Sequence, residues 1–248
     1  MGKLSGKTAV ITGGCSGIGL AIAQLFASEG AAVGILDLDE ARATATATEL
    51  AGHGVKTAGA AADVADEPAV KAAFAKLAGA LGDIDILVNN AGMDTTHPVD
   101  GMATELFDRM IAVHLRGTFL CTREVLPAMK RKGWGRIINL SSQLGHKGGP
   151  TMAHYCAAKA GIMGFTKSLA YEVARDGITA NCINPGPINT PLLKALPQSW
   201  LEMKKGELPI GRFGEVHEIA PAALLLASEE GSYFVGASIN PNGGDYMI

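Results

Sequence analysis

Tyr155 and Lys159 stand four residues apart near the middle of the chain. On a helix this spacing puts the phenol and the ammonium on one face. A nearby positive charge favours the phenolate, so the pair predicts a tyrosine whose pKa is lowered toward neutral pH, ready for acid–base chemistry. Ser142 lies thirteen residues upstream, at the end of an apolar run, where its hydroxyl could hold a substrate oxygen. By itself the Tyr-x-x-x-Lys spacing is common by chance, and a plain surface pair is the better interpretation of it.

A glycine-rich turn makes the constellation more specific. The first apolar run, Thr8–Ile11, is followed by Thr12-Gly13-Gly14-Cys15-Ser16-Gly17-Ile18-Gly19 and then at once by a helical pattern. Glycines let the backbone approach a pyrophosphate, and the helix N-terminus offers free N–H groups to it. A tight turn without a ligand is one alternative interpretation. A methyltransferase that binds S-adenosylmethionine is another, since it uses a similar turn and a later acidic residue.

That acidic residue is Asp37, which ends the next apolar run eighteen residues after Gly19. A carboxylate there can accept hydrogen bonds from ribose hydroxyls and would repel a 2′-phosphate. Asp39 is a competing candidate, but its position suits the N-cap of the following helix. Neither the glycine turn nor the position after Asp37 holds Arg or Lys. The sequence therefore predicts NAD rather than NADP.

Strands and helices must alternate along the chain to position these residues. Continuously apolar runs predict strands at Thr8–Ile11, Ala32–Leu36, Ile84–Val88, Arg136–Leu140, Ile178–Ile183 and Ala237–Ile239, with a weaker candidate at Thr57–Ala62. Such runs are typical of a parallel sheet covered on both faces. Between them lie helical periods, one of which begins at Asp66 and Pro68. The pattern predicts an α/β, doubly wound Rossmann fold with a single parallel sheet and helices on both faces.

A (β/α)8 barrel of similar length is the structural alternative. It would need eight strand–helix units of similar length, whereas residues from about Glu105 to Lys132 form one long helical pattern. Another long helix is predicted after Met152. One open sheet is therefore favoured.

The composition excludes several classes of protein. The chain has 248 residues, of which 48% are hydrophobic and 18% charged, with a net charge of −3, which suits one domain over residues 1–248. The balance excludes disorder and gives no basic surface for nucleic acid. Four scattered cysteines without a C-x-x-C pair argue against disulfides or structural zinc. Without a membrane span or signal peptide, a soluble cytoplasmic protein is expected.

Taken together, the motifs closely resemble those of the short-chain dehydrogenase/reductase family, over essentially the whole chain. The motifs that carry the resemblance are Thr12-Gly13-x-x-x-Gly17-Ile18-Gly19, Asn89-Asn90-Ala91-Gly92, Ser142, Tyr155-x-x-x-Lys159 and Asn184-Pro185-Gly186. The resemblance implies that Tyr155 is the general acid/base and that Ser142 positions the reacting oxygen. Lys159 would tune Tyr155 and hold the nicotinamide ribose. A methyltransferase has no use for this Ser–Tyr–Lys set, so that alternative falls away.

Further cofactor contacts are implied by the same resemblance. Asp63 and Val64 match positions that contact adenine, and Asn90 matches a residue on the cofactor side. Pro185, Ile188 and Thr190 match the segment around the nicotinamide. The glycine turn contributes Gly13, Ser16, Gly17, Ile18 and Gly19.

His114 departs from the family pattern. The family usually has asparagine at this place in the long helix, where it helps hold a water of the proton relay. An imidazole could preserve a relay, because it donates and accepts protons near neutral pH. The alternative is a helix histidine satisfied by a backbone carbonyl, and both interpretations stay open. Elsewhere no histidines and carboxylates have convincing ligand spacing, so no catalytic metal is expected.

The expected function is NAD-dependent hydride transfer between nicotinamide and a secondary alcohol or ketone, such as a polyol, a hydroxy acid or a cyclic alcohol. A 3-oxoacyl-acyl-carrier-protein reductase is the alternative, although those enzymes usually use NADP and carry a basic residue where this chain has Ser16. A non-catalytic dinucleotide-binding module is the remote alternative.

Specificity is expected in residues 190–211, a predicted substrate lid with a possible apolar underside of Leu192, Leu193, Leu196, Trp200, Leu201 and Met203. Candidate wall residues are Met93, Asp94, Gln143, Leu144, His146 and Pro187. Family members of this size are commonly homotetramers. The helix after Tyr155 carries Ala158, Gly161, Ile162, Phe165 and Leu169, which suit either an assembly face or packing within the chain.

Overall fold

Seven parallel strands form one sheet in the computed structural model, which describes residues 2–194 and 196–247. The strands are β1 (Thr8–Thr12), β2 (Ala32–Asp37), β3 (Thr57–Ala61), β4 (Ile86–Asn89), β5 (Gly135–Leu140), β6 (Ile178–Ile183) and β7 (Ser238–Ile239). Their order is β3-β2-β1-β4-β5-β6-β7, so the chain reverses direction across the sheet between β1 and β4. The predicted doubly wound α/β fold is confirmed.

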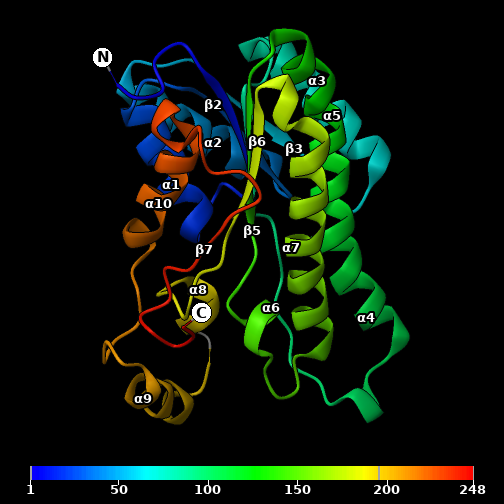
Figure 1. Ribbon diagram of the computed structural model, residues 1–248, viewed down its shortest axis with the longest axis vertical. Coiled ribbons are helices and arrows are strands. Elements are labelled where there is room, and N and C mark those ends of the chain that lie inside the picture. The colour runs from blue at the N-terminus through cyan, green and yellow to red at the C-terminus, as the bar shows by residue number, and fades with distance from the viewer. Residues whose placement is uncertain (1, 195, 248) are drawn as a thin grey trace.

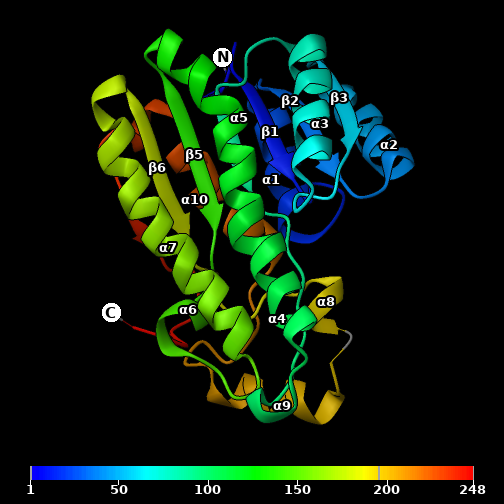
Figure 2. The ribbon, with the colours of Figure 1, turned by 90° about the vertical axis from the view of Figure 1, so that its right-hand side faces the viewer.

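Helices cover both faces of this sheet (Figures 1 and 2). They are α1 (Gly17–Ser28), α2 (Glu40–Leu50), α3 (Glu67–Leu81), α4 (Thr104–Ile111), α5 (Gly117–Lys132), α6 (Leu144–Lys147), α7 (Ala153–Val173), α8 (Pro191–Lys194), α9 (Gln198–Glu207) and α10 (Val216–Ala227). Short 3-10 turns occupy Ala51–His53, Val99–Gly101, Ala174–Asp176 and Glu229–Gly231. Helices α1, α2 and α10 pack on one face, and α3, α5 and α7 on the other, each over its own apolar core.

The weakest predicted strand is real. Residues Thr57–Ala61 form the edge strand β3, which pairs with β2 from Val33 opposite Thr57 to Asp37 opposite Ala61. Its alanines and Gly59 let helix α2 approach closely, because a Cβ on Gly59 would lie 2.6 Å from the backbone of Ala43. The small side chains that made the strand hard to recognise are therefore required by packing.

Both predicted N-caps are confirmed. The Asp39 carboxylate accepts a hydrogen bond from Arg42 N–H at 3.1 Å, and the Asp66 carboxylate accepts one from Ala69 N–H at 3.2 Å. Each carboxylate satisfies a backbone donor that the first helical turn leaves free. Asp39 thus begins α2 and leaves Asp37 as the acidic residue at the end of β2.

The long helical pattern from Glu105 to Lys132 is interrupted, contrary to the prediction of one regular helix. Helix α4 passes into a π-helical turn, Ala112–Arg116, before α5 begins at Gly117. The Thr118 hydroxyl donates to the His114 carbonyl at 2.7 Å within this irregular stretch. Single π-turns often occur at functional sites, and this one carries His114.

Helix α7 buries much of the face that suited an assembly contact. Ala158, Ile162 and Leu169 are at most 4% exposed and pack inside the chain. Of the two interpretations, packing within the chain therefore holds for these three residues. In the part of the chain that the structure describes, no helix is sufficiently long and apolar to cross a bilayer.

Candidate active site

The glycine turn connects β1 to α1 at the carboxyl edge of the sheet. Gly17 has φ of 55°, a left-handed conformation that favours glycine. A Cβ on Gly19 would lie 2.4 Å from the Gly13 carbonyl oxygen, so the backbone passes closer here than any side chain allows. Ser16, the N-cap of α1, makes no side-chain capping bond. The N–H groups of this helix end are thus available to an anion, as the pyrophosphate of a dinucleotide requires.

Asp37 lies at the end of β2 and faces this turn. Its carboxylate accepts hydrogen bonds from the Cys15 N–H at 3.0 Å and the Leu38 N–H at 2.8 Å. The carboxylate borders a groove along the carboxyl ends of β1 to β4. The groove is lined by Gly13, Leu36, Asp37, Leu38, Ala62, Asp63, Val64, Ala91, Gly92, Met93, Arg109 and Val113.

Asp63 and Val64, the expected adenine contacts, both line this groove. Asp63 is fixed on two sides, because Oδ1 accepts from Ala65 N–H at 2.9 Å and Oδ2 pairs with Arg109 at 2.8 Å. Arg109 comes from α4 and was not recognised in the sequence. Its charge is compensated by Asp63. The groove therefore combines the Asp37 carboxylate, which is bound by backbone N–H groups, with the ion pair of Asp63 and Arg109.

Asn90 supports the glycine turn from β4. Its side-chain amide donates to the carbonyls of Thr12 and Gly13, both at 3.0 Å. The Thr12 hydroxyl in turn accepts from the N–H groups of Asn90 and Ala91, each at 3.0 Å. The amide hydrogens of Asn90 therefore shape the glycine turn.

Ser142, Tyr155 and Lys159 come together below the end of β5. Lys159 donates from Nζ to the Leu140 carbonyl at 2.7 Å, and the Ser141 hydroxyl donates to the Lys159 carbonyl at 2.7 Å. The Lys159 Nζ lies 5.6 Å from the centre of the Tyr155 ring. Ser142 is buried and its Oγ accepts the Leu144 N–H at 3.1 Å. These bonds attach α7 to the end of β5. They place Lys159 and Ser142 beside Tyr155, whose hydroxyl is hydrogen-bonded to Ser142.

Burial changes the acidity of this group in a way that the spacing did not predict. It raises the pKa of Tyr155 well above its ordinary value, and hydrogen bonding to Ser142 opposes the rise only in part. Burial also lowers the pKa of Lys159 to about 8. The expected lowering of the tyrosine pKa by Lys159 is therefore not seen, because desolvation of the phenol is the largest effect and the nearby Asp94 adds to the rise in pKa.

His114 is buried beside the same group. Its Nε2 lies 2.8 Å from the Met93 carbonyl oxygen and 3.1 Å from the Met93 nitrogen, while Nδ1 is buried without a partner among the described residues. Burial, followed by the charge of Lys159, lowers the pKa of His114 to about 3. The ring is neutral near pH 7 and its Nε2 is held by backbone, as expected of a satisfied helix histidine, while Nδ1, without a bond in the part of the chain that the structure describes, leaves the relay interpretation open.

The segment after β6 reaches back to the glycine turn. Pro185 is buried, and its carbonyl accepts the Gln143 N–H at 3.2 Å. Ile188 is also buried and forms a parallel bridge with Gly214. A Cβ on Gly17 would lie 3.4 Å from the Thr190 methyl, so Thr190 closes over the N-terminus of α1. The structure thus brings the expected nicotinamide segment between the glycine turn and Ser142.

The predicted lid, residues 190–211, contains α8 and α9 below the carboxyl edge of the sheet (Figure 1). Most apolar side chains of its expected underside are only partly covered, whereas Leu208, directly after α9, is buried. Leu193, Leu196, Trp200 and Leu201 are half-buried, and Met203 is 55% exposed. Ala195 and the side chain of Leu192 lie outside what the structure describes. Helix α9 has no fully buried residue, so apolar packing alone holds it weakly.

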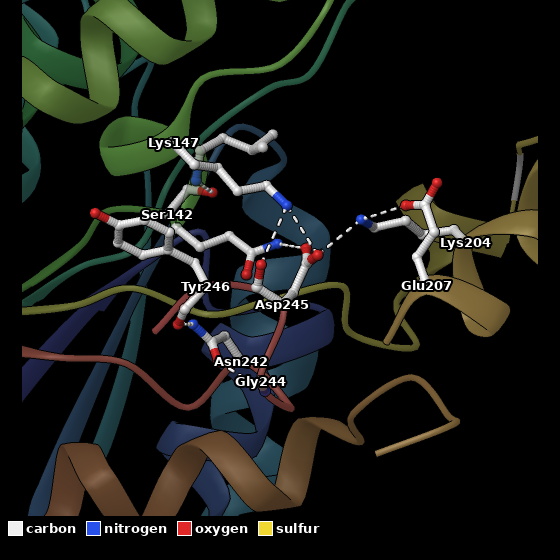
Figure 3. Close-up of polar contacts among 10 residues, drawn as sticks. Ser142, Lys147, Lys204, Glu207, Asn242, Gly244, Asp245 and Tyr246 are labelled. Carbon is white, nitrogen blue, oxygen red and sulfur yellow. Dashed lines mark hydrogen bonds and ion pairs between the residues drawn. The ribbon is translucent and has the colours of Figure 1, made fainter. Parts of the chain in front are cut away.

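A group of charged residues beside Ser142 was missed in the sequence. Asp245, near the C-terminus, contacts Lys147 on α6 and Lys204 on α9 (Figure 3). Asp245 is 98 residues from Lys147 and 41 residues from Lys204 in the sequence, and no motif indicates that they meet, so the group could not be predicted. In residues 2–194 and 196–247, no cluster of His, Cys, Asp and Glu could hold a metal ion.

A doubly wound sheet with a glycine turn after β1 and an acidic residue after β2 defines the Rossmann class of dinucleotide-binding proteins. The family model for short chain dehydrogenases matches residues 7–200. The chain therefore belongs to the short-chain dehydrogenase/reductase family, whose members are oxidoreductases that act on CH–OH groups with a nicotinamide dinucleotide.

Similar proteins differ in substrate. The chain is 41% identical to 2-dehydro-3-deoxy-L-rhamnonate dehydrogenase (NAD(+)) of Sphingomonas sp. strain SKA58, over 98% of this chain and 96% of that protein. It is 40% identical to the 3-oxoacyl-acyl-carrier-protein reductase FabG of Aquifex aeolicus strain VF5, over 98% of both. A Sinorhizobium meliloti 1021 structure described as a short-chain alcohol dehydrogenase superposes with a TM-score of 0.94 and 32% identity, covering 98% of this chain and 97% of that one.

Proposed function

We propose that this protein is an NAD-dependent dehydrogenase that transfers hydride between nicotinamide and a secondary alcohol or ketone, with Tyr155 as general acid/base. The observation that carries the proposal is the convergence of Ser142, Tyr155 and Lys159 next to the groove that begins at the glycine turn. A binding module without catalysis would have no use for this wall of side chains.

The residues present fit a dinucleotide. The uncapped start of α1, from Gly17 to Gly19, suits the pyrophosphate, with Gly13 and Ser16 completing the turn. Asp37 would accept the ribose hydroxyls of the adenosine half, and Asp63 and Val64 would meet the adenine. Pro185, Ile188 and Thr190 would border the nicotinamide, with Asn90 supporting the turn. When bound, nicotinamide supplies the hydride acceptor or donor.

NAD is preferred over NADP because of Asp37. Its carboxylate would repel a 2′-phosphate, and the Arg109 charge nearby is paired with Asp63. The Sphingomonas relative named for NAD(+) is consistent with this preference.

The chain's own residues carry the proton. In oxidation the Tyr155 phenolate takes the hydroxyl proton of the substrate, and in reduction the phenol returns it. Ser142 and Tyr155 together would stabilise negative charge on the substrate oxygen. Lys159, bound to the Leu140 carbonyl, holds a positive charge 5.6 Å from the Tyr155 ring and would reach the nicotinamide ribose. His114 is proposed to orient the wall beside Tyr155, with its ring bound to Met93.

The substrate is proposed to be a small molecule rich in polar groups, such as a polyol, a hydroxy acid or a cyclic alcohol. Three buried oxygens close to the catalytic residues, Asp94 Oδ1, Gln143 Oε1 and Asn184 Oδ1, have no hydrogen-bond partner among the described residues. Buried acceptors without donors are costly, and substrate hydroxyls would satisfy them. An acyl-carrier-protein thioester, as in the name of the Aquifex relative, is the second candidate.

The assembly is proposed to be a homotetramer. Phe119 on α5 and Tyr171 on α7 are 42% and 92% exposed, and large exposed apolar side chains are common where subunits meet. Light scattering on the purified protein would test this, and a monomer mass would contradict it.

The test of the function is the formation of reduced nicotinamide from NAD or NADP with polyols, sugar acids, cyclic alcohols and 3-hydroxyacyl thioesters. Turnover with NAD and a hydroxylated small molecule is expected. Preference for NADP with thioesters would favour the reductase alternative. Tight binding of NADH without turnover of any alcohol would favour the non-catalytic module.

A further inference from the structure

One carboxylate joins three segments that are far apart in the sequence. Asp245 Oδ1 lies 2.8 Å from Lys147 Nζ on α6 and 2.8 Å from Lys204 Nζ on α9. Its Oδ2 accepts a hydrogen bond from the side-chain amide of Gln143, the residue directly after Ser142. The Asp245 side chain is only 5% exposed, and its partners Lys204 and Lys147 are 13% and 26% exposed, so the carboxylate is largely shielded from water, most of all on the Lys204 side. Charged bonds of this kind are stronger and more directional than surface ion pairs.

The C-terminal segment is shaped to present this carboxylate (Figure 3). Asn242 donates from Nδ2 to the Tyr246 carbonyl at 2.6 Å, and its Oδ1 accepts the Gly244 N–H at 3.0 Å. Gly244 has φ of 85°, a conformation that a side chain would strain. The Tyr246 ring stacks on His146 with centroids 5.4 Å apart. The tail therefore lies against α6 in a defined turn.

Helix α9 is bonded to the C-terminal segment through this carboxylate. None of its residues is fully buried, whereas Lys204 is 13% exposed and points to Asp245. Its other ion pair, from Lys204 to Glu207 at 3.0 Å, stays within the same helix and cannot attach α9 to the rest of the protein. The bond to Asp245 is thus the charged link between the lid and the loop that carries Ser142.

We propose that Asp245 is a positioning residue for the substrate: through one carboxylate it ties the lid helix α9, by Lys204, to the catalytic loop, by Gln143 and Lys147. The proposal rests on the proposed function, in which Ser142 holds the substrate oxygen and residues 190–211 cover it. Asp245 acts through Gln143 and Lys204 and does not itself take part in proton transfer.

The kinetic test compares Asp245→Asn and Lys204→Met with Lys205→Met. Lys205 is the matched control because it lies on the same helix but has a different partner. Its Nζ lies 5.3 Å from the centre of the Phe213 ring. Loss of a charged bond predicts a substrate KM about tenfold higher for Asp245→Asn and Lys204→Met. We expect kcat to change less than KM, and the NADH Kd to stay at the wild-type value. The double variant should have the KM of either single variant, because both remove the same link.

A second test needs no turnover. Trp200 lies on α9, and the other tryptophan, Trp134, bonds to Glu229 at 2.8 Å beside β5. In a Trp134→Phe background, acrylamide quenching of fluorescence reports the exposure of Trp200 alone. Asp245→Asn and Lys204→Met should each increase the quenching constant, and Lys205→Met should not. If Trp134→Phe is unstable, the difference between wild type and Trp200→Phe gives the same signal.

The outcomes separate the two proposals. A raised KM and stronger quenching in Asp245→Asn support the positioning role. Wild-type values of both in Asp245→Asn, or an equal rise of KM in Lys205→Met, would overturn it. Where wild type turns over no substrate, the proposed function fails, and the quenching result still decides whether Asp245 holds α9.

Discussion

The ring of His114 meets the ring of Tyr155 edge-on, with centroids 5.5 Å apart and planes at 85°. The imidazole lies against Gly92 as well, since a Cβ on Gly92 would come within 2.5 Å of His114 Cε1. His114 therefore packs into a space formed by the Asn-Asn-Ala-Gly motif on one side and Tyr155 on the other. Its position in the π-helical turn after α4 brings it there.

This relationship predicts a pH-dependent stability. The pKa of His114 is about 3 in the folded protein, below its ordinary 6.5. Between these values the unfolded chain binds a proton that the folded protein does not, so stability falls as pH decreases below about 6.5, by at most about 1.4 kcal/mol per pH unit. His114→Asn should flatten this dependence. Denaturant unfolding at about pH 5 and pH 7 measures it, and an unchanged slope would contradict the assignment.

His114→Asn should also leave hydride transfer largely intact. The neutral ring is not a charged acid near pH 7, its Nε2 lies at the Met93 backbone, and asparagine, the residue usual at this place in the family, can likewise hold a water. The measurement is kcat of the variant at neutral pH. Total loss of activity would show that the imidazole is irreplaceable.

Tyr155→Phe should remove most turnover. The variant keeps the ring but loses the group that exchanges the proton, and general acid–base catalysis contributes about 10²- to 10⁴-fold. NADH binding should persist, because the groove from Gly13 to Asp63 is unaltered. Tyr233→Phe is the control, since the Tyr233 side chain is 98% exposed. A Tyr155→Phe enzyme with wild-type kcat would exclude Tyr155 as the acid/base.

Oxidation of the alcohol should become faster as pH rises above neutral. Burial raises the pKa of Tyr155, so the phenol is protonated near pH 7 and must lose its proton to act as a base. Reduction of the ketone needs the protonated phenol, which remains the main form over this range, so its rate should change much less with pH. Initial rates in both directions between about pH 6 and pH 10 test this. Parallel profiles in the two directions would contradict it.

Asp37→Ala should shift coenzyme preference. Without the carboxylate, hydrogen bonds to the ribose are lost, and the KM for NAD should rise about tenfold while the KM for NADP falls. Asp39→Ala is the comparison, because Asp39 caps α2. That variant should lose about 1 kcal/mol of stability and keep the NAD to NADP ratio. An unchanged ratio in Asp37→Ala would show that another residue selects the coenzyme.

The succession of strands and helices along the chain, the doubly wound class and the family could all be predicted from the sequence. Apolar runs are continuous where strands are buried on both faces, and glycine is required where the backbone turns at Gly17 or passes closely at Gly19. These are local constraints, so they can be recognised one segment at a time. The N-caps Asp39 and Asp66 were predictable for the same reason.

Tertiary structure decided the electrostatics and the long-range contacts. The spacing of Tyr155 and Lys159 predicted a lowered tyrosine pKa, but desolvation, which depends on everything packed around the phenol, raises it. Two ion pairs join residues that are distant in the sequence. Arg109 and Asp63 are 46 positions apart, and Lys204 and Asp245 are 41 positions apart. Side chains so far apart in sequence meet only when the whole chain has folded, because packing, and not local conformation, sets their distance.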